Sequence, residues 1–225
     1  MTSGFRRYDT SAEEGRLQGL RQAKAALERG ELVVLPTDTV YGVAANAFSP
    51  SAVAGMLKAK GRGRNSPPPV LIAGAHQLEA LANQIPEVAR KLAEQYWPGA
   101  LTLVLTAQPA LDWDLGETRG TVALRVPNND VTLELIREFG PIAVSSANLH
   151  GAPAATDCDQ AVKQLGDSVA VYLDAGQSSI GEASTILDLT PIALGDPVRV
   201  LRQGAIPGDA LLEFISANTA EASEQ

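Results

Sequence analysis

Cysteine and aromatic side chains are scarce in this chain of 225 residues, which has one cysteine and 4% aromatic residues. The single thiol, Cys158, has no intramolecular disulfide partner, which fits a reducing cytoplasm. No stretch approaches the roughly 20 apolar residues of a membrane-spanning helix. The arginines near the N-terminus precede no apolar signal-peptide core. We therefore expect a soluble, cytoplasmic protein without a membrane partner.

Motifs of the commoner nucleotide, metal and redox sites are also missing. The sequence contains neither a GxxxxGK[ST] phosphate loop nor a GxGxxG turn. His76 and His150 lie far apart and lack metal-ligand spacing, and Cys158 has no CxxC partner. These absences argue against a P-loop ATPase, a protein-held metal site and covalent cysteine chemistry. We interpret Cys158 as a structural residue.

The charge balance is acidic, with a formal net charge of −8 and a pI of about 4.8. This balance argues against sequence-independent binding to a nucleic-acid backbone, which relies on clustered cations. One segment is locally basic despite the acidic total. It contains Lys58, Lys60, Arg62 and Arg64, with no acidic residue between them. Such a cluster indicates either a solvated face or a site for a small anion.

The composition, with 45% hydrophobic and 20% charged residues, is typical of a globular protein that needs no disulfide or metal to fold. Apolar runs typical of strands alternate with amphipathic stretches typical of helices. Strands are predicted at 31–37, 70–73, 101–106, 121–126, 141–146, 169–174, 184–189 and 198–202. Helices are predicted between Ser11 and Gly30 and at 51–60, 76–84, 87–96, 130–139, 157–166 and 208–217.

This alternation predicts an α/β fold with a twisted sheet covered by helices. Several strands follow one another without a helix, so we expect a mixed sheet. The first helix has a capping-box signal in Ser11 and Glu14, and Gly30 follows at its C-terminal end. We predict a single domain over residues 1–217 and an acidic, flexible tail over residues 218–225.

Short polar motifs lie where predicted strands or helices end. Small polar residues beyond strand ends favour a ligand site in α/β proteins. Within the strand 121–126, Thr121, Ala123 and Arg125 share one face, and Arg125 requires an internal salt bridge or an anionic ligand. Arg202 lies on the same strand face as two valines, which indicates a buried or ligand-paired guanidinium. The motifs are Pro36-Thr-Asp-Thr-Val-Tyr-Gly42, Lys60-Gly-Arg-Gly-Arg-Asn-Ser-Pro67, Thr121-Val-Ala-Leu-Arg125, Ser145-Ser-Ala-Asn148, Ser184-Thr185 and Arg202.

In this order, the motifs resemble the YrdC/TsaC/Sua family of L-threonylcarbamoyladenylate synthases. WPGALTLVL at 97–105 and PTDTVYGVAANAF at 36–48 extend the similarity, which covers about residues 13–215 and resembles the short, single-domain form. The resemblance implies a strongly twisted mixed sheet with a concave, positively lined cavity. It also implies an enzyme that joins L-threonine, bicarbonate or CO₂, and ATP into threonylcarbamoyl-AMP with release of pyrophosphate.

The resemblance also assigns roles to individual residues. Thr39, Arg125 and Ser184 would contact L-threonine. Lys60, Arg62, Ser146 and Asn148 match the family's KxR and SxN signature and would be catalytic. The residues that would contact ATP are Lys60, Arg62, Ser66, Thr121, Ser146, Asn148 and Arg202. Magnesium would accompany the ATP, held mainly by phosphate oxygens. The product would pass to the tRNA threonylcarbamoyl transferase machinery, which forms N6-threonylcarbamoyladenosine (t6A) in tRNAs that read codons beginning with A.

Some positions depart from the family pattern. Leu71 lies where many long-form relatives have a histidine, Ala154 replaces a frequent serine and Gln203 a frequent proline. The Pro67–Pro69 run and the extra Arg64 suggest a different shape for the ATP-side loop and leave the Ser66 contact open.

Two alternatives differ in class. One is a paralogue with the same fold and another activity. A carbamoyl-phosphate module would also share the fold, but such a module is expected only within a longer chain. The other is an RNA-binding or ribosome-maturation factor that uses the same cavity and binds tRNA or RNA, at least weakly. The acidic charge and the few aromatic residues argue against the second alternative.

Overall fold

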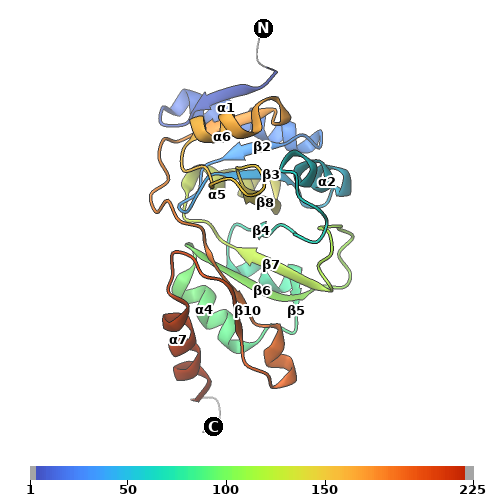
Figure 1. Cartoon of the computed structure of the whole chain (residues 1–225), viewed down its shortest axis with the longest axis vertical. Helices are drawn as coiled ribbons and strands as arrows, with labels where there is room; N and C mark the ends of the chain where they lie inside the picture. The colour runs from blue at the N-terminus through green and yellow to red at the C-terminus, as the bar shows by residue number, and fades with distance from the viewer. Residues whose placement is uncertain (1–3, 221–225) are drawn as a thin grey trace.

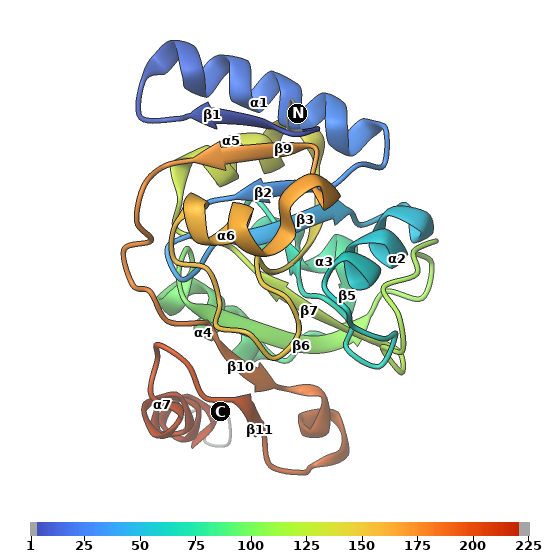
Figure 2. The same ribbon diagram turned by 45° about the horizontal axis from the view of Figure 1, so that its top comes forward.

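The computed structural model describes residues 4–220, which form a mixed sheet with helices on both faces (Figures 1 and 2). The α-helices are α1 (Glu13–Glu28), α2 (Pro50–Ala59), α3 (Leu78–Leu81), α4 (Glu87–Tyr96), α5 (Asp130–Phe139), α6 (Cys158–Leu165) and α7 (Gly208–Ala220). Three 3₁₀ helices lie at Ala75–Gln77, Gly166–Ser168 and Thr190–Leu194. The strands are β1 (Arg6–Asp9), β2 (Val33–Leu35), β3 (Gly42–Asn46), β4 (Val70–Leu71), β5 (Ala82–Asn83), β6 (Leu101–Ala107), β7 (Thr121–Arg125), β8 (Ile142–Ser146), β9 (Val171–Asp174), β10 (Thr185–Asp188) and β11 (Arg199–Arg202).

The strand order is β1-β9-β2-β3-β8-β4-β7-β6-β10-β11, with β5 paired to β6. The sheet contains both parallel pairs, such as β2 with β9 and β4 with β7, and antiparallel pairs, such as β3 with β8 and β6 with β7. The predicted mixed α/β sheet is therefore confirmed. None of the helices within residues 4–220 is long and apolar enough to cross a membrane.

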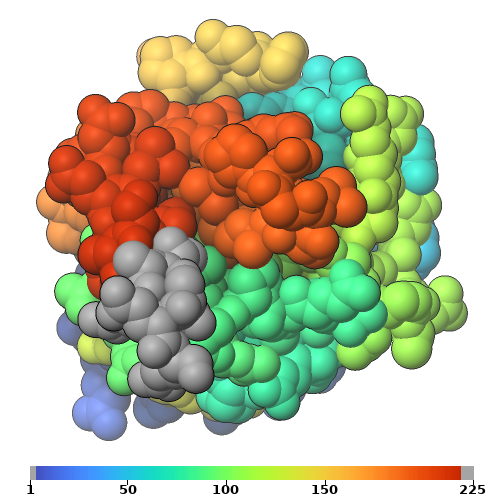
Figure 3. Space-filling model, turned by 90° about the horizontal axis from the view of Figure 1, so that it is seen from below, coloured from blue at the N-terminus to red at the C-terminus, as the bar shows by residue number. Residues whose placement is uncertain are grey.

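Side chains of the central strands alternate in direction and pack into two hydrophobic cores, one on each face of the sheet. Val33 and Leu35 of β2 pack into one core with α1 and α5, whereas Val34 packs into the larger core on the other face. This is the period of two that a strand buried on both faces requires. The larger core continues to the C-terminal end, where Tyr96 of α4 and Phe214 of α7 make an edge-to-face ring contact. Helix α7, red in Figure 3, lies against the green part of the chain that includes α4.

The structure corrects several local predictions. The capping box of Ser11 and Glu14 is wrong, because α1 begins after Ala12 without a side-chain cap and the Ser11 hydroxyl bonds to Asp9 Oδ1 at 2.6 Å. The predicted helix at 76–84 is broken into a 3₁₀ turn, the short α3 and the strand β5. Helix α7 continues to Ala220, beyond the predicted 217. Of the predicted tail, residues 221–225 lie outside the described part.

Candidate functional site: an arginine-lined cavity at the strand ends

A cavity of about 750 Å³, including the space that opens to solvent, lies where the predicted motifs converge. The turn between β2 and β3, the ends of β7, β8 and β11, the start of β10 and the proline run all contribute to its wall. Its lining is Thr37, Thr39, Val40, Tyr41, Gly42, Arg62, Pro67, Pro68, Pro69, Leu71, Thr102, Arg125, Val144, Ser145, Ser146, Ala183, Ser184, Ile186 and Arg202.

Among the described residues, the lining contains three arginines and no acidic residue. Arg62, Arg125 and Arg202 come from segments far apart in the sequence, so the fold itself gathers their charge. A partly enclosed cavity with one sign of charge concentrates ligands of the opposite sign. The site is therefore suited to an anion, and this cavity corresponds to the positively lined cavity implied by the sequence.

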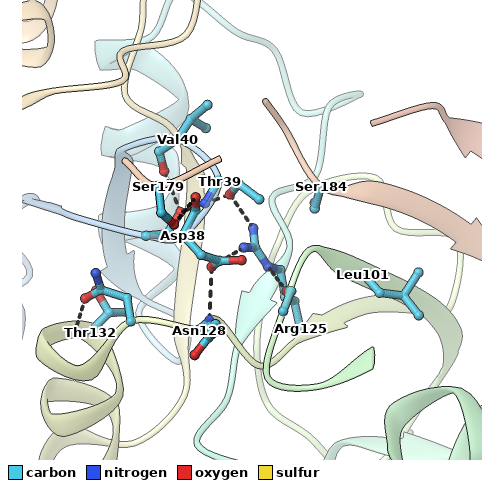
Figure 4. Close-up of polar contacts among 12 residues, drawn as sticks. Asp38, Thr39, Val40, Leu101, Arg125, Asn128, Thr132, Ser179 and Ser184 are labelled. Atoms are coloured by element: carbon cyan, nitrogen blue, oxygen red, sulfur yellow. Dashed lines mark hydrogen bonds and ion pairs between the residues drawn. The ribbon is translucent and has the colours of Figure 1, made fainter. Parts of the chain in front are cut away.

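Arg125 is anchored by three acceptors at the base of the cavity (Figure 4). Its Nη2 donates to Asp38 Oδ1 at 2.6 Å, its Nη1 to Thr39 Oγ1 at 2.8 Å and its Nε to the Gly99 carbonyl at 2.8 Å. Asp38 also accepts from the Asn128 backbone N–H at 3.0 Å. Arg125 and Asp38 are 6% and 4% exposed, so their charges form a buried pair. Burial lowers the pKa of Arg125, and the Asp38 carboxylate opposes that shift.

This arrangement shows which partner Arg125 has. The sequence left open an internal salt bridge or an anionic ligand, and Asp38 supplies the salt bridge. These contacts use three of the five guanidinium N–H groups, and the other two remain available to a ligand. Proline at position 36 ends β2, and the chain then turns so that Thr37, Asp38 and Thr39 reach this point.

The C-terminal end of α2 places Lys60 beneath the cavity wall. Lys60 is fully buried, and its ammonium donates to the Ser146 carbonyl, to the Asn148 carbonyl at 2.6 Å and to Asn148 Oδ1 at 3.3 Å. The Asn148 amide also donates to the Leu149 and Ala152 carbonyls. Lys60 thus joins the end of α2 to the segment after β8. Burial, and after it the charge of Arg62, lowers the pKa of Lys60 to about 7.

Arg62 has few contacts with its own chain. Its Nη1 lies 3.4 Å from Ser145 Oγ, a long contact, and its buried Nε has no hydrogen-bond partner among the described residues. Gly61, with φ of +67°, provides the left-handed turn that directs the chain from α2 toward the cavity. A guanidinium in the cavity wall with an unsatisfied N–H favours an external anion as its partner.

Ser184 and Arg202 form a further part of the wall. Arg202 donates to the Ser184 carbonyl at 2.7 Å and to Ser184 Oγ at 2.9 Å, and Ser184 Oγ lies 2.8 Å from Thr102 Oγ1. Arg202 is exposed as a residue, but its guanidinium hydrogen bonds to Ser184 are partly buried and burial lowers its pKa, so the expected burial holds only for part of the side chain. Its position in the cavity lining is compatible with the other expectation, pairing with a ligand.

Six of the ten predicted site residues line the cavity: Thr39, Arg62, Arg125, Ser146, Ser184 and Arg202. Lys60 and Asn148 support its wall from behind. Thr121 lies outside the lining and bonds to the Thr118 carbonyl at 2.8 Å, and Ser66 precedes the lining prolines without joining them. In the basic cluster, Lys58 and Arg64 are exposed, and Arg64 pairs with Asp114 at 2.9 Å.

The sequence reasoning missed Thr37, Asp38, Thr102 and Ser145 as site residues. Thr37, Asp38 and Ser145 belong to motifs that had been singled out, so motif membership could have found them. Thr102 gave no signal, because it occupies a strand that is apolar apart from Thr102 and Thr106.

Cys158 is expected to be unreactive in the folded protein and dispensable for turnover. The thiol lies in the larger core at 1% exposure, outside the cavity, and burial raises its pKa to about 12. Because the thiolate is the nucleophile, iodoacetamide should not modify it at pH 8 unless the protein is unfolded in urea. Cys158→Ser should keep near-normal turnover, and a large kinetic loss would contradict the structural role.

Curated relatives share the sequence along most of its length. A Mycobacterium tuberculosis protein, provisionally named threonylcarbamoyl-AMP synthase, is 49% identical over 213 residues, which are 95% of this chain and 96% of that protein. A Bacillus subtilis protein named threonylcarbamoyl-AMP synthase is 41% identical over 200 residues, which are 88% of this chain and 56% of that protein.

Solved structures agree with the fold. Pyrococcus abyssi Sua5, crystallised with L-threonine, superposes with a TM-score of 0.84 at 35% identity, over 94% of this chain and 60% of that one. Escherichia coli YciO superposes with a TM-score of 0.77 at 23% identity, over 91% of this chain and 97% of that one, which shows the fold alone. A family model for Sua5, YciO and YrdC, described as telomere recombination, matches residues 25–204. With most of its length matched in sequence and in fold, this chain belongs to the Sua5/YciO/YrdC family.

Proposed function

We propose that this chain is an L-threonylcarbamoyl-AMP synthase that uses L-threonine, bicarbonate or CO₂, and MgATP. The observation that carries the proposal is the cavity itself, in which three arginines and several hydroxyls face a space without any acid. Two anions must meet there, the carbamate formed from L-threonine and the triphosphate of ATP. The relatives named threonylcarbamoyl-AMP synthase and the family relative crystallised with L-threonine support the same reaction.

The reaction joins two anions, and this determines what the residues must do. The neutral amino group of threonine adds CO₂ and loses a proton, or reacts with bicarbonate and releases water, to become a carbamate. One carbamate oxygen then attacks the α-phosphorus of ATP, and the bond from that phosphorus to pyrophosphate breaks. Fixed cations reduce the repulsion and stabilise the charge on the leaving pyrophosphate. In this proposal Arg125 binds the threonine carboxylate, with Thr39 and Ser184 beside it. Arg62 and Arg202 face the phosphates.

The remaining predicted residues have supporting roles in the proposal. Lys60 and Asn148 hold the segment that presents Ser146, and Thr121 and Ser66 would reach ATP only if neighbouring loops move. The magnesium ion enters with ATP as part of the substrate. Phosphate oxygens bind magnesium well, so the protein need supply few of its ligands.

The test is pyrophosphate release with MgATP and bicarbonate, with and without L-threonine. We expect release that requires both threonine and bicarbonate, together with threonylcarbamoyl-AMP in the mass spectrum. A folded protein that releases no pyrophosphate in response to threonine would overturn the proposal. Tight, salt-sensitive tRNA binding without turnover would instead support the RNA-binding alternative. In the cell, the product would pass to the cytoplasmic tRNA threonylcarbamoyl transferase machinery for t6A formation.

ATP binding is expected to take up a proton near pH 7.5 through Lys60. The lowered pKa of about 7 leaves part of this group neutral in the free protein. The phosphates favour its charged form, so its pKa rises on binding and the affinity for ATP falls as pH rises above about 7. Calorimetry in buffers of different ionisation enthalpy measures this uptake. Lys60→Met should remove it, and an unchanged uptake in that variant would contradict the assignment.

A further inference from the structure

The turn between β2 and β3 brings two threonine hydroxyls together at the base of the cavity. Thr37 Oγ1 and Thr39 Oγ1 lie 2.9 Å apart, and either atom could in principle donate to the other. Both residues line the cavity, and they are 4% and 1% exposed. Each hydroxyl has one proton and two lone pairs, so the other partners of the two oxygens determine the direction of this bond.

The proton of Thr37 is already used. Thr37 Oγ1 lies 2.6 Å from the Val40 carbonyl, which can only accept. The same oxygen accepts from the Thr39 backbone N–H at 3.2 Å. Withdrawing the proton from Val40 would leave a buried carbonyl without its donor, at a cost of about 1–3 kcal/mol. Thr37 is therefore a donor to Val40 and has one lone pair left for its neighbour.

The proton of Thr39 must then point to Thr37. Two oxygens at 2.9 Å attract only when a proton lies between them, and Thr37 has none to spare. Thr39 Oγ1 also accepts from Arg125 Nη1 at 2.8 Å. The bonds run in one direction, from Arg125 through Thr39 and Thr37 to the Val40 carbonyl. One lone pair on Thr39 is left, so toward the cavity this hydroxyl can only accept.

We propose that Thr37 is a positioning residue that makes Thr39 an obligatory acceptor for the side-chain hydroxyl of the bound amino acid. This inference rests on the proposed function and identifies what selects the amino acid. A carboxylate has no proton to give Thr39, and the unused N–H groups of Arg125 suit that carboxylate. The amino nitrogen carries the carbamate toward ATP at the Arg62 side. The nitrogen keeps one N–H on that side, and the other remaining donor of L-threonine is its hydroxyl.

The first test compares L-threonine with L-2-aminobutyrate, which has the same carbon skeleton without the hydroxyl. We expect kcat/KM to favour L-threonine about tenfold or more, because the analogue leaves the Thr39 lone pair unsatisfied in a buried site. Thr39→Val should reduce this preference to near unity. Calorimetric affinities for the two amino acids, measured beside pyrophosphate release, should show the same preference.

The second test changes the direction in which the Thr39 hydroxyl donates its proton. Thr37→Val removes the acceptor of the Thr39 proton and frees that proton to point into the cavity. O-methyl-L-threonine can accept but cannot donate, so Thr37→Val should lower the preference for L-threonine over this analogue by about tenfold. The bulk of the added methyl group is the same for both enzymes and cancels in the comparison. Thr37→Ser keeps the hydroxyl and should keep the original preference.

The outcomes separate this inference from the proposed function. A protein without threonine-dependent pyrophosphate release overturns both. Turnover that uses L-threonine and L-2-aminobutyrate equally well overturns the inference alone. Equal losses for all amino acids in Thr37→Val would show a merely structural role and also overturn it. If Thr37→Val does not fold, Thr37→Ala removes the same acceptor and takes its place in the O-methyl-L-threonine comparison.

Discussion

Replacing Arg125 with alanine is expected to abolish threonine-dependent pyrophosphate release and to lower the free energy of unfolding by about 3–5 kcal/mol. The activity is lost because the cavity guanidinium that bonds to Thr39 is removed. The stability is lost because Asp38, at 4% exposure, keeps a buried charge with no counter-ion. Denaturant unfolding and the pyrophosphate assay measure the two effects separately.

A double variant separates these two roles. Asp38→Asn together with Arg125→Met removes both charges, and the Asn128 backbone N–H can still bond to the new amide oxygen. Neutralising a buried pair costs less than breaking it, so the double variant should be more stable than Arg125→Ala while staying inactive. Equal stability of the two variants would contradict the Asp38 pairing. Turnover in either variant would contradict the role of Arg125 in binding threonine.

The Arg125 network illustrates how far sequence reasoning reaches. A guanidinium in an apolar strand has to be paired, so a buried partner could be predicted. The identity of that partner depends on a contact across 87 positions of the chain. Asp38 belongs to one of the strand-end motifs, but the local sequence does not predict that its carboxylate points toward β7. Strand order and register decide that contact, and they follow from the packing of the whole sheet.

The missed and misplaced elements have a similar cause. Strand β3 has the sequence Gly-Val-Ala-Ala-Asn, whose small residues have little strand propensity, and it forms because β2 and β8 pair on both sides. Its Gly42 leaves no room for a side chain, since a Cβ there would lie 2.5 Å from Val144 Cγ1. Strand β1 is short, polar and exposed, so its pattern resembles a loop. In each case tertiary pairing overrides local preference.

The sheet also explains why Thr121 and Arg125 are separated. They share a strand face, as their spacing predicts, but about 13 Å of extended chain lies between them. Only the Arg125 end of β7 reaches the cavity, and Thr121 lies beside the loop that contains Thr118. A shared face therefore predicts a common direction without predicting a common site.

Replacing Arg62 with alanine is expected to reduce kcat by about 100- to 1,000-fold while the free energy of unfolding changes by less than about 0.5 kcal/mol. Arg62 differs from Arg125 in having no buried counter-ion. Its one contact to Ser145 is 3.4 Å long, and its buried Nε has no partner among the described residues. Little native bonding is therefore lost when the side chain is removed. What is lost is the fixed cation that we propose faces the phosphates.

Lys58→Ala is the matched control, because it removes one positive charge four residues earlier from an exposed position outside the arginine-lined cavity. It should change kcat less than about threefold, since an exposed charge at that distance is screened by solvent and salt. Equal losses in the two variants would show that net charge, and not the position of Arg62, supports turnover. A large loss of stability in Arg62→Ala would show a structural role. An unchanged kcat would remove Arg62 from the phosphate site, leaving Arg202 as the cation there.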